Sequence, residues 1–79
     1  MNVIYDRVEV VFRVSGSLVD CRQACELIMT HRDFYARYDE AFEELIIGTR
    51  SGTAKDAKRV FYDAMDTLNK EGKKVVYYG

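Results

Sequence analysis

Apolar and polar side chains largely alternate along residues 7–14, and this alternation restricts the fold more than any other feature of the chain. Apolar residues fall on one side of the alternation: Val8, Val10, Phe12 and Val14. Arg7, Glu9, Val11 and Arg13 fall on the other. A period of two is that of a β-strand with one face on a core and one toward water. We therefore predict a strand over residues 3–14, ended by Ser15-Gly16-Ser17.

Capping signals predict two helices. Ser17, with Asp20 three residues later, begins a helix that we expect from Leu18 to about Thr30. Thr53, with Asp56 three residues later, begins another. The buried positions of this later helix are predicted as Ala57, Val60, Phe61, Ala64 and Leu68. Gly72 is the glycine expected where that helix ends, and residues 73–78 predict a short closing strand.

Residues 34–47 fit two interpretations. As a helix, the segment places apolar residues on one face at steps of three and four: Phe34, Tyr38, Ala41, Phe42, Leu45 and Ile46. As two strands, it forms Phe34–Tyr38, a turn at Asp39-Glu40, and Glu43–Thr49. The helical pattern is the more regular one, and Ala, Glu and Leu favour helix. We therefore predict a helix here and keep the strand pair as the alternative.

The predicted fold is α+β, in a single domain over residues 1–79. Its preferred order is β-α-α-α-β, with a small sheet of the terminal strands packed on helices. The alternative is the ferredoxin-like order β-α-β-β-α-β. A two-stranded sheet is marginal unless another chain extends it, and the long first strand would leave part of its edge open. We therefore expect a homodimer that uses this edge or the helical surface.

The sequence predicts a cytoplasmic protein without a cofactor or a membrane partner. It shows no secretory signal pattern, and no apolar run approaches the roughly 20 residues that span a bilayer. Cys21 and Cys25 lie on the apolar side of the first helix, so we expect buried free thiols rather than metal ligands. His31 is the only histidine and has no evident nucleophile beside it. We therefore predict no catalytic residue, no metal site and no enzymatic activity.

The glycine-containing loop over residues 48–52 invites comparison with phosphate-binding loops. The Walker pattern needs four residues between its glycines and Lys directly after the second. Here three residues separate Gly48 from Gly52, and Lys55 comes three residues later. This spacing excludes the nucleotide-hydrolase interpretation. A helix N-terminus with Arg50, Thr53 and Lys55 remains a candidate site for one anion.

Charge is unevenly distributed although the net charge is only −1. Residues 33–47 contain five acidic residues and one arginine, whereas residues 48–60 contain four basic residues and one aspartate. On a helix, acidic residues four apart repel each other. A solvated helix face is the simpler interpretation of this cluster, and a docking face for a basic partner is the alternative; for the protein as a whole we prefer docking. Aromatic residues are enriched in binding surfaces. The predicted partner-binding residues are Tyr35, Tyr38, Asp39, Glu40, Glu43 and Glu44.

The preferred function is therefore a small protein-interaction module or inhibitor. The alternative is a nucleic-acid-binding domain that uses the basic third helix (Lys55, Lys58 and Arg59) and the C-terminal strand, where Tyr77 and Tyr78 would stack on bases. In size and charge the chain resembles small phage-encoded inhibitors such as anti-CRISPR proteins. That resemblance implies docking on a larger host complex, often through an acidic surface. It carries no residue-level correspondence.

Overall fold

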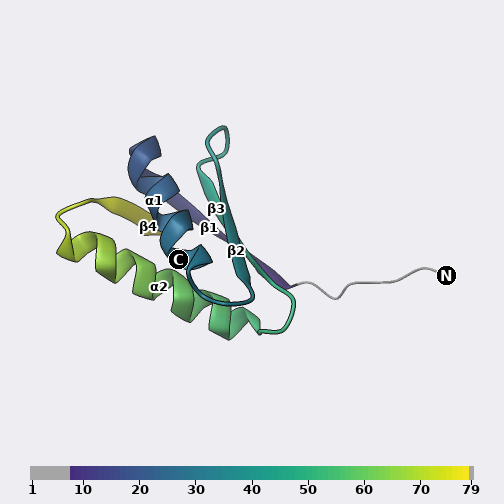
Figure 1. Ribbon diagram of the computed structural model, residues 1–79. Coiled ribbons are helices and arrows are strands. Elements are labelled where there is room, and N and C mark those ends of the chain that lie inside the picture. Colours follow the sequence, from purple (N-terminus) through teal and green to yellow (C-terminus); the bar gives the residue numbers. More distant parts are fainter. Residues whose placement is uncertain (1–7, 79) are drawn as a thin grey trace.

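The computed structural model describes residues 8–78, in six elements (Figure 1). In chain order these are β1 (Val8–Gly16), α1 (Leu18–Met29), β2 (Phe34–Asp39), β3 (Glu44–Thr49), α2 (Ala54–Lys70) and β4 (Val75–Tyr78). The strands form one antiparallel sheet in the order β2-β3-β1-β4. This β-α-β-β-α-β order is the ferredoxin-like one. The α+β class and the alternative order are therefore confirmed, and the preferred β-α-α-α-β order is wrong.

The helix predicted over residues 34–47 is replaced by the β2–β3 hairpin. β2 pairs with β3 along its whole length, from Phe34 opposite Thr49 to Asp39 opposite Glu44. β3 also pairs with β1 on its other side. Five consecutive residues of β3, from Leu45 to Thr49, are buried. Burial on both faces of a central strand leaves no polar alternation in the sequence, which is why the helical pattern looked more regular.

The other predicted elements are present. In β1, Phe12 and Val14 are buried whereas Val11 and Arg13 are exposed, as the alternation predicted. β1 continues to Gly16, two residues beyond the predicted end, because Gly16 pairs with Val75 of β4. Residues 3–7 of the predicted strand lie outside the described residues.

Capping begins both helices as predicted. The backbone N–H of Asp20 donates to Ser17 Oγ at 3.1 Å, at the start of α1. Thr53 and Asp56 form a capping box at the start of α2. Beyond the end of α2, Gly72 has a φ of 78°, a left-handed conformation that glycine adopts without strain.

The core lies between the two helices and one face of the sheet. Phe12 of β1 stacks on Phe61 of α2 with ring centroids 3.8 Å apart. Cys21 and Cys25 are buried in the same core as free thiols, as the sequence predicted.

The other face of the sheet carries no helix (Figure 1). On this open face the Tyr35 ring crosses β3 over Gly48, and its hydroxyl donates to Glu9 of β1 at 2.8 Å. A Cβ at residue 48 would lie 2.0 Å from the tyrosine ring, so a side chain there would require the ring to move. Side chains of the open face leave Ile46 only 5% exposed without any helix over it.

Candidate functional site

The acidic residues gather at the connection between β2 and β3. Asp39, Glu40, Glu43 and Glu44 lie within six residues of each other, at the end of the hairpin that projects from the sheet (Figure 1). We call residues 39–44 the acidic hairpin. The helix face predicted from the sequence is therefore wrong, although the predicted acidic residues do lie together.

The turn of the acidic hairpin is held in one shape. Asp39 Oδ1 accepts hydrogen bonds from the backbone N–H groups of Ala41, at 3.1 Å, and Phe42, at 3.3 Å. An aspartate that caps its own turn in this way favours a tight connection. Glu43 then adopts a left-handed φ of 51°. The N–H of Val14 in β1 donates to the Glu43 carbonyl at 3.0 Å and ties the turn to the sheet.

Phe42 lies in this turn and is 67% exposed. The sequence interpretation missed it, because a helix over residues 34–47 would have buried Phe42 with the other apolar residues. The strand-pair alternative contained the signal, since it leaves residues 41 and 42 between the two strands. Beside Phe42 lies a hollow of about 350 Å³, lined by Arg13, Val14, Phe42, Glu43 and Tyr78.

Like charges face each other at the base of the acidic hairpin. Asp39 lies directly opposite Glu44 in the sheet, and like charges in this position repel. Glu44 also lies opposite Arg13 of β1, which offsets part of that repulsion. Glu40 and Glu43 are exposed, so they are the carboxylates best placed to meet a partner.

Neither predicted tyrosine projects with the acidic residues. Tyr35 lies over Gly48 on the open face and reaches toward β1. Tyr38 packs half-buried against the core, on the face that the helices cover. Burial and the neighbouring Cys21 raise the pKa of the Tyr38 hydroxyl. Phe42, rather than either tyrosine, is therefore the aromatic side chain available at this site.

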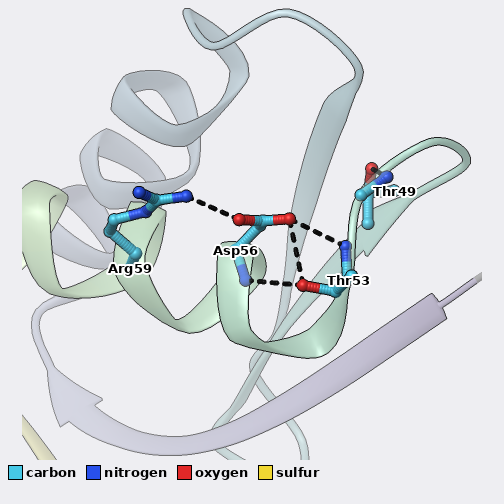
Figure 2. A network of polar contacts seen from close by, with 5 residues as sticks. Thr49, Thr53, Asp56 and Arg59 are labelled. Atoms are coloured by element: carbon cyan, nitrogen blue, oxygen red, sulfur yellow. Dashed lines mark hydrogen bonds and ion pairs between the residues drawn. The ribbon is translucent and has the colours of Figure 1, made fainter.

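The N-terminus of α2, where anion binding was predicted, already holds the carboxylate of Asp56 (Figure 2). The backbone N–H of Thr53 donates to Asp56 Oδ2 at 3.1 Å, and the Asp56 N–H donates to Thr53 Oγ1 at 3.2 Å. Hydrogen bonds from Thr53 and then the nearby Arg59 guanidinium lower the pKa of Asp56. Arg50 and Lys55 are exposed. Anion binding by Arg50, Thr53 and Lys55 stays a prediction.

Two basic residues of α2 pair with carboxylates of the same helix. Arg59 pairs with Asp56, and Lys70 pairs with Asp66 at 3.2 Å. Tyr77 and Tyr78 point to opposite faces of the sheet. Tyr77 packs against Phe61 with ring centroids 5.2 Å apart, whereas Tyr78 is 63% exposed on the open face. A stacking surface made of both tyrosines is therefore not formed.

The cysteines are buried in the core and ionise poorly. Burial raises the pKa of Cys21, and it raises the pKa of Cys25 to about 11. Because the thiolate is the reactive form, both thiols are poor nucleophiles at neutral pH. Within residues 8–78, no group of three or more His, Cys, Asp or Glu side chains is placed to hold a metal ion.

Comparisons with known proteins add no functional information. No family model, no curated protein and no solved structure matches the chain. Neither α1 nor α2 is long and apolar enough to cross a membrane.

Proposed function

We propose that the chain is a protein-interaction module that docks on a basic surface of a larger partner through the acidic hairpin. The observation that carries this proposal is the exposed Phe42 in a hydrogen-bonded turn flanked by Glu40 and Glu43. Aromatic side chains that enter a partner's pocket supply much of the affinity of an interface. Complementary charge around such an anchor speeds encounter and selects the partner.

The fixed shape of the turn supports the same proposal. Ordering a flexible loop on binding costs roughly 0.5–1.5 kcal/mol for each side chain that is immobilised. Asp39 and the bond from Val14 to Glu43 hold the turn in the free protein. The hollow beside Phe42 would admit one side chain of the partner. Surfaces rich in Lys and Arg, such as those that hold nucleic acid, match this chemistry, and occupying one would make the protein an inhibitor.

The test is capture of partners from a lysate of the source cell by the immobilised protein. Glu40→Lys with Glu43→Lys reverses two exposed charges of the acidic hairpin. Asp63→Lys with Asp66→Lys makes the same change in net charge on exposed positions of α2 and serves as the control.

We expect the hairpin variant to lose the proteins that the wild-type chain captures, and the α2 variant to keep them. Far-ultraviolet circular dichroism checks that both variants fold. Equal retention by the two variants would mean that docking does not use the acidic hairpin.

A further inference from the structure

β2 forms an open edge along the sheet. It pairs with β3 at all six of its residues and has no strand on its other side within the described part of the chain. The Val14 N–H points toward β3, because it donates to the Glu43 carbonyl. In an antiparallel sheet these directions alternate from residue to residue. The register of β1 with β3 fixes these directions in β3, and the register of β3 with β2 fixes them in β2. The N–H and C=O groups of Ala36 and Tyr38 therefore face outward, away from β3.

This edge lacks several common protections against strand pairing. Natural edge strands are commonly blocked by proline, by lysine or by a bulge. Residues 34–39 contain neither proline nor lysine, and their register with β3 is unbroken. The charged side chains of the strand, Arg37 and Asp39, lie on the open face and not along the edge. An added strand therefore meets available backbone groups.

We propose that the occupant is β2 of a second copy of this chain, paired antiparallel about a two-fold axis at Ala36. Each Ala36 N–H would donate to the Ala36 carbonyl of the second copy. Each Tyr38 N–H would donate to the Phe34 carbonyl of the second copy. The outward N–H groups of Ala36 and Tyr38 in both copies are then satisfied, and the two sheets join into one.

Side chains select this register over its neighbours. An axis at Arg37 would set the two guanidinium groups directly opposite each other at a close position, with Cα atoms about 4.5 Å apart. An axis at Tyr38 would pair Ala36 with Glu40, which lies beyond the end of β2. The axis at Ala36 places a small side chain at the centre. It also sets Phe34 beside Tyr38 of the second copy, and such aromatic cross-strand pairs stabilise sheets.

The flank of α1 above this edge supports the choice of occupant. Gln23 and Leu27 face the end of α2 and the segment that follows it, where Gln23 accepts a hydrogen bond from Lys73. Leu18, Arg22 and Met29 lie on the opposite flank of α1 by the helical period. Met29 is 48% exposed there. Pairing of β2 with its copy would bring the two α1 flanks together and cover Met29.

The other incompletely paired edge of the sheet is less suited. β4 pairs only with Arg13 to Gly16, which leaves the earlier part of β1 with a neighbour on one side among the described residues. That is the open part of the first strand that the sequence predicted. A strand laid along it would meet the end of β4 at Tyr78, which lies opposite Arg13. The β2 edge has no such obstruction over its whole length.

Dimerisation in this register is independent of the proposed docking function. The paired strands run in opposite directions, so the two acidic hairpins lie at opposite ends of the joined sheet and Phe42 stays uncovered. Either proposal can therefore fail without the other.

The test on the wild-type protein combines sedimentation with amide exchange followed by nuclear magnetic resonance. As concentration rises from about 10 to about 500 μM, the mass should rise from 9.2 kDa toward twice that value. Over the same range, the amides of Ala36 and Tyr38 should exchange at least about tenfold more slowly. The amide of Val11, which faces outward from β1, should not change.

A matched pair of cysteine variants tests the register. Ala36→Cys should form a disulfide-linked dimer under mild oxidation, because residues paired across the axis have Cα atoms about 5.5 Å apart, within the range of a disulfide. Arg37→Cys should cross-link more slowly. The native thiols should not interfere, since both are buried with a raised pKa.

A mass of 9.2 kDa throughout the concentration range would overturn the proposal. So would a dimer that protects Val11 instead of Ala36 and Tyr38, or faster cross-linking of Arg37→Cys than of Ala36→Cys.

Discussion

Single residues of the open face are fixed by contacts between strands. Tyr35 covers the backbone of Gly48, and its hydroxyl bonds to Glu9 two strands away. Glycine weakens a strand because it has no side chain to pack. An aromatic ring laid over a glycine from a neighbouring strand restores the missing packing. The sequence shows both residues but not their contact, because Tyr35 and Gly48 meet only once the hairpin has formed.

We predict that Gly48→Ala destabilises the protein by about 1–3 kcal/mol, because the new methyl group would displace the Tyr35 ring. Denaturant unfolding measures this change. In a Tyr35→Ala background the same substitution should cost nothing, because the obstructing ring is gone. An equal cost in both backgrounds would show that the ring is not the obstruction.

Asp56 is the residue from which we predict a pH effect. Its hydrogen bonds lower its pKa in the folded state. A group with a depressed folded pKa stabilises the protein above its unfolded pKa of about 3.9, and this contribution is lost as pH falls through the folded value. Wild type should therefore melt at a higher temperature than Asp56→Asn at pH 7. The difference should shrink below about pH 4; a difference that does not vary with pH would contradict this assignment.

At the scale of elements, the two helices and the hairpin differ in what specifies them. Local capping signals predict both helices, whereas the β2–β3 hairpin forms through pairing with a strand that is distant in the sequence. Ser17 and Thr53 cap α1 and α2 through bonds that span three residues, so the sequence suffices to place these helix starts. The hairpin depends on β1, which pairs with β3, and on the core shared with the helices, in which Leu45 and Ile47 are buried. This pairing is not visible in the sequence. The helical spacing of apolar residues over residues 34–47 therefore led to the wrong prediction of a helix.

The same error concealed the aromatic residue of the candidate site. The acidic residues could be predicted from charge clustering alone. The preferred helix hid Phe42, because its exposure follows from the turn that Asp39 holds and only the strand-pair alternative leaves residue 42 in a connection. Tyr35 and Tyr38 precede the acidic residues in the chain, but β2 directs the first side chain over Gly48 and the second against the core.

A substitution at Glu43 can separate the effect of this residue on stability from its effect on partner binding. Its φ of 51° is one that glycine adopts without the steric cost borne by other residues. We predict that Glu43→Gly leaves stability unchanged or raises it by up to about 1 kcal/mol, while capture of the partner weakens. Thermal unfolding and capture measure the two effects. Glu40, which is not among the residues with positive φ, provides the control.

Glu40→Gly should lower stability, because it adds freedom to the unfolded chain without relieving strain. If Glu43→Gly were the more destabilising of the two, the conformation assigned to the turn would be wrong.

Over the whole molecule, charge is divided between the two ends of β3. The strand begins at Glu44 in the acidic hairpin and ends at Thr49, directly before Arg50 and the basic start of α2. A molecule with separated charges is oriented by a charged partner before contact. We predict that the association rate with the partner falls steeply as salt rises from about 50 to about 500 mM, while the dissociation rate changes little.

Stopped-flow mixing measures both rates. In the variant with Glu40→Lys and Glu43→Lys the dependence of association on salt should be lost. A wild-type association rate that does not respond to salt would show that the acidic residues do not contribute to the encounter with the partner.

The most direct measurement of the docking proposal is the affinity of Phe42→Ala for the captured partner, by isothermal titration. The matched control is Tyr62→Ala, which also removes an exposed aromatic ring but from α2, away from the hairpin. If Phe42 is the anchor, its loss should weaken binding by at least about 30-fold, as expected for a residue that contributes about 2 kcal/mol. Tyr62→Ala should change the affinity less than about threefold. Equal affinities of Phe42→Ala and wild type would contradict docking through the acidic hairpin.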